Sequence, residues 1–185
     1  MTLFKGKYRI ESARLRGWDY ASAGWYYITV CTRNRVCFLG DVAEGIMHLS
    51  PIGEIVAEEW QKTETIRPNV ELDEWIIMPN HLHGIIVLNH AIETPRLFVE
   101  TPRRGVSTAN NRTGLKPNSI GSIVGQFKSI CTKRIWSGGF LNFAWQSRFH
   151  DHIIRDEESL IRIREYIVNN PAKWDLDEEN PANCK

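Results

Sequence analysis

The sequence predicts one α+β domain, built on a mostly antiparallel sheet with helices packed on one face. Its 185 residues suit a single domain with a sizeable core, and no internal repeat divides them. The apolar periodicity changes along the chain in the order strand, helix, two strands, helix, strand, helix. This order is similar to a ferredoxin-like (RRM-like) arrangement.

The first half supplies the first four elements of that order. Aromatic and β-branched residues over 24–34 predict a strand, and the stretch "IMHLS" predicts a short one. A helix is expected over 50–66, where Ser50 can act as N-cap before Pro51. "VELDEWIIMPN" and "HLHGIIVL" then predict two strands, or one strand interrupted by a turn or bulge at Pro79-Asn80.

The second half begins with a composition typical of a long loop. Residues 89–118 are rich in proline, glycine and small polar side chains, and predict a mobile basic loop within the single domain 1–185. Helical periodicity returns over 119–136, a strand is expected over 148–155, and a helix with an acidic first turn over 156–170.

The chain after this helix is expected to be irregular. Proline disfavours helical angles in the residue before it, so Pro171 is expected to end the helix by pushing Asn170 away from them. The acidic tail 175–185 is expected to be loosely held.

Composition and charge narrow the class of protein. No apolar run is long enough to cross a membrane, and no signal peptide is evident, which favours the cytoplasm. The four cysteines show no CxxC spacing, which argues against a zinc ribbon or a disulfide scaffold. Net charge is only +1, but residues 1–35 and 96–148 carry +5 and +8. These two basic blocks could form a nucleic-acid-binding face.

Two histidines, with one residue between them, interrupt the most apolar predicted strand. In a strand His81 and His83 point to the same face, while Leu82 points into the opposite layer. Two neutral imidazoles at this spacing can bind one divalent ion and leave coordination positions open for catalysis. An isolated HxH is weak evidence, because two ordinary histidines at a strand end give the same pattern.

Further candidates lie near the C-terminus. Tyr166 and Asn170 are four residues apart and share one helical face, at the edge of its apolar stripe. The amide oxygen of Asn170 is a reasonable metal ligand, and the tyrosine is a candidate nucleophile. A second HxH, formed by His150, Asp151 and His152, has a charged middle residue and is expected to support the site or face the substrate.

Three stretches, "MPNHLHGIIV", "WQSRFHDHIIR" and "REYIVNNPAKW", together resemble the single-tyrosine HUH transposases, and most of all the bacterial REP-associated tyrosine transposases. The resemblance covers the chain from about Tyr26 to Trp174. It implies a ferredoxin-like fold and a metal-dependent endonuclease and strand transferase that nicks hairpin-associated single-stranded DNA through a 5′-phosphotyrosine. Tyr166 would match the family's nucleophile, and His81 and His83 its metal-binding histidines. Asn170 falls where related enzymes carry a polar third ligand, often the longer Gln.

The resemblance also implies a cofactor and partners. Mg²⁺ or Mn²⁺ would be the cofactor, and single-stranded or hairpin DNA the partner, bound by a monomer or a homodimer. Basic residues are candidates for phosphate contacts, and exposed aromatic residues could stack unpaired bases. The basic candidates are Arg103, Arg104, Arg112, Lys116, Lys128, Lys133 and Arg134. The aromatic candidates are Trp136, Trp145 and Phe149.

Two other functions remain open at this point. The chain could be a domesticated transposase that binds DNA or RNA hairpins without cutting them. It could also be an unrelated metal hydrolase, which would need carboxylate ligands near the histidines, such as Asp73 and Glu74. A covalent protein–DNA adduct would separate the three.

Overall fold

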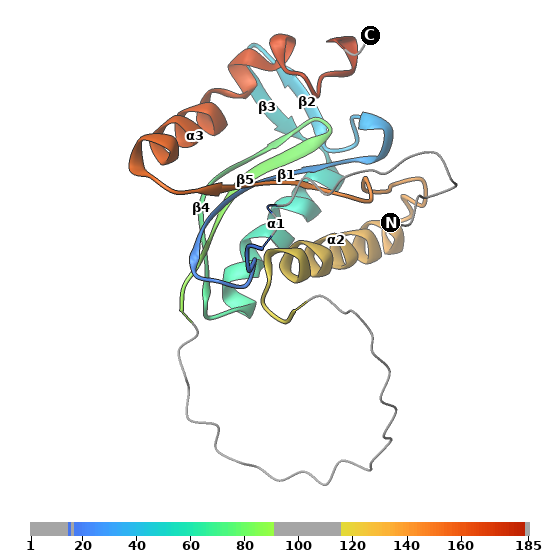
Figure 1. Ribbon diagram of the computed structural model, residues 1–185. Helices are drawn as coiled ribbons and strands as arrows, with labels where there is room; N and C mark the ends of the chain where they lie inside the picture. Colours follow the sequence, from blue (N-terminus) through green and yellow to red (C-terminus); the bar gives the residue numbers. More distant parts are fainter. Residues whose placement is uncertain (1–14, 16, 91–115, 184–185) are drawn as a thin grey trace, which may run out of the picture.

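The fold is built on a four-stranded antiparallel sheet with the strand order β4-β5-β1-β6 (Figure 1). The computed structural model describes residues 15, 17–90 and 116–183. Most of the predicted basic loop, and with it Arg103, Arg104 and Arg112, lies outside the described residues. The sheet strands are β1 (Gly24–Cys31), β4 (Val70–Met78), β5 (His81–Leu88) and β6 (His150–Ile154).

The three long helices begin at side-chain caps. They are α1 (Pro51–Ile66), α2 (Ile120–Ser137) and α3 (Glu157–Asn169). Each cap side chain accepts a hydrogen bond from the backbone N–H three residues later. This N–H lies in the first turn, where no backbone carbonyl of the helix is available to accept it. The cap residues are Ser50, Ser119 and Asp156.

The predicted α+β class and the antiparallel sheet are confirmed, and α1 and α2 lie on one face as expected. The third helix differs, because α3 covers the opposite face (Figure 1). On that face Ile167 packs against Ile85 and Val87. Every residue of β5 is buried, so this strand needs cover on both faces. The consecutive apolar residues from Ile85 to Leu88 were the sequence signal for that second layer.

A small hairpin stands apart from the main sheet. Strands β2 (Gly40–Ala43) and β3 (Ile46–Leu49) pair antiparallel through a tight turn at Glu44 and Gly45, both with positive φ. The sequence predicted β3 but not β2, in which three of the four residues, Gly40, Asp41 and Ala43, are of types that strands disfavour.

The chain after α3 does not become irregular at Pro171. Asn170 keeps helical angles (φ −60°, ψ −43°), and Pro171–Leu176 continues as a 3₁₀ helix, η2. Proline is tolerated here because it occupies the first turn of a new helix, where its missing N–H is not required. The next residues are also ordered against the sheet: the Glu179 carbonyl accepts a bond from Asn80 at 2.7 Å, and its carboxylate pairs with Arg35 at 2.7 Å. The described part of the acidic tail therefore differs from the loose segment that was expected.

Candidate functional site

The two histidines stand side by side at the start of β5, facing α3. Their ring centroids are 4.3 Å apart and both side chains are buried. Leu82 between them points to the other face, into the core under α1 and α2. Strand β5 pairs with β1 and β4 on its two sides, so this pair sits on a rigid part of the sheet.

Asn80 determines which nitrogen of His81 carries the proton. Both hydrogens of the Asn80 amide are donated to carbonyls, those of Arg35 at 3.0 Å and Glu179 at 2.7 Å. The Asn80 oxygen lies 2.8 Å from His81 Nδ1, and this oxygen can only accept. His81 therefore carries its proton on Nδ1 and has a bare lone pair on Nε2.

That lone pair is buried and unused. Nε2 of His81 has no hydrogen-bond partner among the described residues. Burial, reinforced by the positive charge of Arg35, lowers the pKa of His81 to about 3, so the ring is neutral at physiological pH. A neutral imidazole whose outer N–H is held by a carbonyl oxygen is the usual form of a metal-binding histidine.

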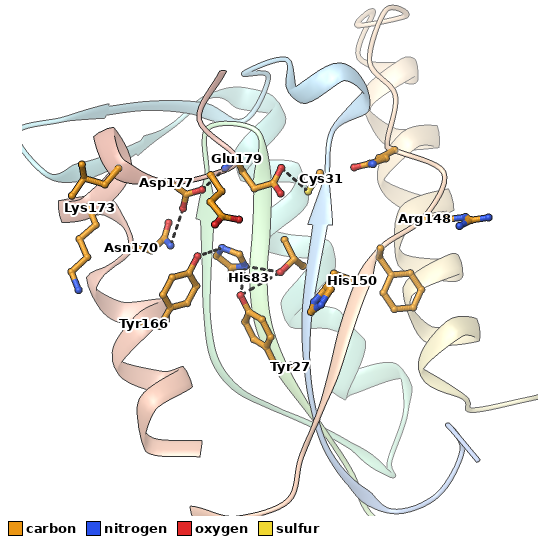
Figure 2. Close-up of a pocket in the computed structure, with 15 residues that line it drawn as sticks. Tyr27, Cys31, His83, Arg148, His150, Tyr166, Asn170, Lys173, Asp177 and Glu179 are labelled. Atoms are coloured by element: carbon orange, nitrogen blue, oxygen red, sulfur yellow. Dashed lines mark hydrogen bonds between the residues drawn. The ribbon is translucent and has the colours of Figure 1, made fainter. Parts of the chain in front are cut away.

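His83 links the sheet to the candidate nucleophile. Its Nδ1 lies 2.7 Å from the Tyr27 hydroxyl and 2.9 Å from Thr29 Oγ1 on β1. Its Nε2 lies 3.3 Å from the Tyr166 hydroxyl on α3 (Figure 2). Burial, and after it the neighbouring His81, hold the pKa of His83 well below its ordinary value. Its ring too is neutral.

Helix α3 places Tyr166 and Asn170 over the histidines, as their spacing predicted. Tyr166 is 44% exposed and can be reached from solvent, whereas Asn170 is buried. The Asn170 amide donates to Asp177 Oδ2 at 3.1 Å, and its oxygen Oδ1 has no partner among the described residues. The Asn170 oxygen is thus a second buried atom, near His83, that has a free lone pair to offer a metal ion (Figure 2).

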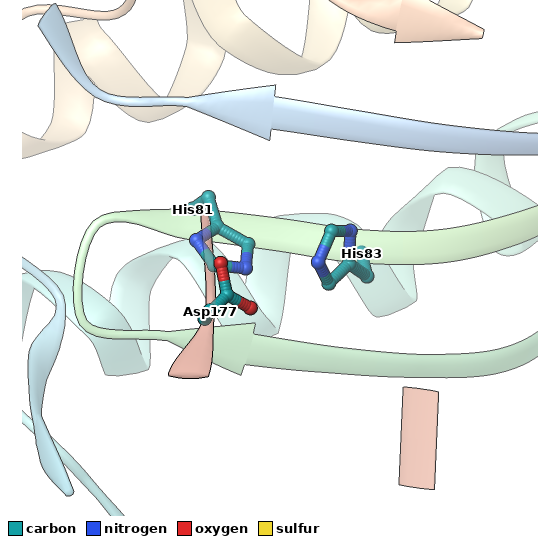
Figure 3. A group of neighbouring side chains, drawn as sticks. All are labelled: His81, His83 and Asp177. Atoms are coloured by element: carbon teal, nitrogen blue, oxygen red, sulfur yellow. The ribbon is translucent and has the colours of Figure 1, made fainter. Parts of the chain in front are cut away.

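Asp177 is a site residue that sequence reasoning missed. It follows η2, and it forms with His81 and His83 a group whose donor atoms lie within 4.8 Å of one another (Figure 3). It falls in the acidic tail 175–185, which was expected to be loosely held. The available signal was the short spacing from Asn170, because the 3₁₀ helix η2 carries the chain across this interval to the histidines.

This donor set fits a divalent cation. Two buried donor atoms, His81 Nε2 and Asn170 Oδ1, have no hydrogen-bond partner among the described residues, and leaving such atoms unpaired is costly. Two neutral imidazoles, one carboxylate and one amide oxygen can together hold such an ion. Mixed nitrogen and oxygen ligands do not select one ion.

The surroundings of Tyr166 oppose its ionisation. Burial, followed by the negative charge of Asp177, raises the pKa of the Tyr166 phenol above its ordinary value. A hydrogen bond from Asn170 acts in the opposite direction, but the next two carboxylates, Glu178 and Glu179, raise the pKa further. A positive charge placed nearby would act in the opposite direction and lower this pKa.

An ion pair fixes α3 to the sheet. Arg164 donates to both carboxylate oxygens of Asp73, with Nη2 2.7 Å from Oδ2, and its guanidinium lies 5.6 Å from the Trp25 ring centroid. Asp73 sits at a register shift of β4 between Leu72 and Trp75, and such irregularities redirect side chains. Because Asp73 pairs with Arg164, the geometry gives no support to a hydrolase that uses this carboxylate as a metal ligand.

The second HxH contributes one residue to the pocket. His150 lines the cavity of about 710 Å³ that contains His83 and Tyr166. Asp151 is buried, and Asp151 and His152 both line a separate depression near the start of α3. The structure therefore brings His150, but not the other two, to the pocket.

The described basic candidates divide into two pairs. Lys116 forms an ion pair with Asp19 at 2.8 Å, and Arg134 pairs with Glu58 at 2.7 Å and with Glu59. Lys133 and Lys128, whose amine donates to the Gln146 carbonyl, line a groove beside α2. Within the described ranges, no helix is both long and apolar enough to span a membrane.

The fold and this site define an antiparallel α+β domain in which a buried histidine pair faces a helix-borne tyrosine. A REP-associated tyrosine transposase, solved bound to a REP hairpin, shares this fold with a TM-score of 0.53 and 22% identity, over 82% of this chain and 68% of that one. A putative transposase from Deinococcus radiodurans aligns with a TM-score of 0.45 and 15% identity, over 84% of this chain and 95% of that one.

Sequence comparison places the chain in a family. It is 37% identical over 173 residues to an uncharacterized protein of Haemophilus influenzae, covering 94% of each chain. The chain belongs to the same family as that protein. A scan against models of known protein families finds no match.

Proposed function

We propose that this chain is a metal-dependent single-stranded DNA endonuclease and strand transferase of the single-tyrosine HUH type, with Tyr166 as its nucleophile. The observation that carries the proposal is the position of the Tyr166 hydroxyl, 3.3 Å from His83 Nε2 and beside two unused buried donor atoms. The fold shared with a tyrosine transposase supports it.

The reaction follows from the chemistry of a phenol and a phosphodiester. The Tyr166 oxygen attacks the scissile phosphorus, the Oη–P bond forms, and the P–O3′ bond breaks. Tyr166 loses its proton, and the departing strand end takes up one to become a 3′-hydroxyl. The phosphotyrosine conserves the bond energy, so a 3′-hydroxyl can later attack it and rejoin strands.

The chain's own residues hold the parts of this reaction in place. A divalent cation held by His81, His83, Asn170 and Asp177 would polarise a phosphoryl oxygen and offset developing negative charge. Ionising an ordinary tyrosine at pH 7 costs about 4 kcal/mol, and more here because the pKa of Tyr166 is raised. His150, in the same pocket, is our candidate for accepting the phenol proton.

A second function is favoured by one observation. The raised pKa of Tyr166 favours a domesticated protein that binds hairpins without cutting them, because a phenol that stays protonated is a weak nucleophile. Such a protein would bind DNA and never form a covalent adduct.

The test is formation of a covalent protein–DNA adduct. Purified protein is incubated with Mn²⁺ and single-stranded hairpins taken from the DNA that flanks its gene, and adducts are resolved on a denaturing gel. We expect an adduct with the wild type, none with Tyr166→Phe, and equal DNA binding by both. An adduct that persists in Tyr166→Phe refutes the nucleophile, and cleavage unaffected by His81→Ala refutes the metal ligand.

A further inference from the structure

Beside α2 lies a second depression, which we call the α2 groove. It has a volume of about 860 Å³ and runs between one face of α2, from Gly125 to Ser137, and the segment 144–147 that leads back towards β6. Gln146 lines both the α2 groove and the pocket of Tyr166, so the two depressions are neighbours.

The α2 groove differs from the Tyr166 pocket in its charge. Lys128 and Lys133 line it, together with several hydroxyl groups, and none of the described residues in its lining is acidic. The Tyr166 pocket, by contrast, has three consecutive carboxylates, Asp177, Glu178 and Glu179, in its lining beside the basic Arg148 and Lys173. An anionic ligand is therefore favoured in the α2 groove.

A fixed aromatic face accompanies these charges. The Trp136 side chain is 47% exposed, and its indole N–H donates to the Phe143 carbonyl at 2.9 Å, which holds the ring in place. A Cβ added at Gly125, at the other end of the lining face of α2, would meet no atom within 4 Å. The α2 groove therefore has open space at its Gly125 end and an immobilised ring at its Trp136 end.

We propose that the α2 groove binds unpaired nucleotides on the same strand as the scissile phosphate, with a base stacked on Trp136 and phosphates paired with Lys128 and Lys133. A base has a flat apolar face and its backbone carries one negative charge per nucleotide, which matches an exposed indole flanked by two amines. The inference rests on the proposed function, because the strand in question is the one that Tyr166 cleaves.

The first experiment measures binding without cleavage. Fluorescein-labelled oligothymidylate is titrated with the full chain, and its anisotropy is followed. Trp136→Ala is expected to weaken binding about 5- to 150-fold, the loss typical of one stacked base. Leu141→Ala, which removes a 73% exposed apolar side chain outside the groove lining, is the matched control and is expected to leave affinity unchanged.

A steric block provides an independent variant. In Gly125→Met the new side chain enters the α2 groove, while the helix gains a better helix former, so the melting temperature is expected to hold or rise. Affinity for oligothymidylate is expected to fall as in Trp136→Ala. Wild-type affinity in both variants would overturn the inference.

Photocrosslinking places the strand. 5-Iododeoxyuridine is substituted at successive positions on either side of the cleavage site in a hairpin that gives the Tyr166 adduct, and crosslinked peptides are identified by mass spectrometry. We expect crosslinks to Trp136 from one side of that site. Crosslinks confined to other peptides would overturn the inference, as would a Trp136→Ala variant that changes only the oligomeric state in sedimentation.

The two proposals fail in different ways. If wild-type protein binds oligothymidylate through Trp136 but never forms an adduct, the strand is held and not cut, and the cleavage function is refuted. If the adduct forms and both groove variants bind and cleave as wild type does, the α2 groove alone is refuted.

Discussion

Replacing Asn80 by alanine tests the arrangement that holds His81 in its metal-binding form. The variant removes two bonds donated to backbone carbonyls and the acceptor for His81 Nδ1–H. At about 1 kcal/mol for each bond, the free energy of unfolding should fall by about 3 kcal/mol. Loss of the outer partner of a ligating histidine typically lowers metal affinity about 10- to 100-fold.

The matched variant is Asn80→Asp, which separates the two effects. Its carboxylate still accepts from His81 but cannot donate to the carbonyls of Arg35 and Glu179. We expect it to lose stability in urea unfolding while keeping its affinity for Mn²⁺ in calorimetric titration. Asn89→Ala is the control, because Asn89 is exposed and follows the other end of β5 from Asn80. It should change the free energy of unfolding by less than about 0.5 kcal/mol. Equal Mn²⁺ affinity in wild type and Asn80→Ala would refute the reasoning.

Three further predictions follow from the same geometry. The pKa of His81 is about 3 in the folded chain against an ordinary 6.5, so as pH falls the unfolded chain takes up this proton first. The free energy of unfolding of the metal-free protein should therefore fall between about pH 6.5 and pH 3, by up to about 5 kcal/mol from this group. In urea unfolding, His81→Gln should show a correspondingly shallower loss. Arg164→Met should lower the free energy of unfolding by about 1 to 2 kcal/mol and reduce the adduct yield. Arg162→Ala, which removes an exposed ion pair, should lower the free energy of unfolding by less than about 0.5 kcal/mol. Equal losses of stability in the two variants would contradict the role of the Arg164–Asp73 ion pair. Since Tyr166 meets the histidines of its own chain, mixing His81→Ala with Tyr166→Phe should restore no adduct, and recovery of adduct would mean that the tyrosine acts in trans.

The sequence carries most of the fold because its local signals agree with one another. Apolar periodicity, capping residues and turn residues fall together at α1, α2 and α3, and each helix lies within about two residues of its predicted limits. Strand β2 lacks such agreement, since three of its four residues are Gly, Asp and Ala, which strands disfavour. The position of α3 on the second face depends on packing between distant segments, which periodicity within α3 does not encode.

The candidate site divides in the same way. The pairs His81–His83 and Tyr166–Asn170 each lie on one element, so regular spacing predicts that their members share a face. Asp177 reaches the site only because the chain continues through η2 after Pro171. Asn80 was interpreted as a turn residue, and its role depends on contacts with Glu179, ninety-nine positions further on in the sequence.

The charges around Tyr166 would connect the proposed nucleophile to a cation bound at the proposed metal site. Without an ion, Asp177 is negative and raises the pKa of the phenol, so the tyrosine is held in its unreactive form. A divalent cation bound by Asp177 and two neutral histidines would leave this cluster with a net charge of +1, and the sign of the electrostatic effect on Tyr166 would reverse. In the empty site Asp177 would oppose ionisation of Tyr166. In the loaded site Asp177 would hold the cation, whose positive charge favours that ionisation. Because both imidazoles are kept neutral by burial, this reversal does not require either ring to lose a proton near neutral pH.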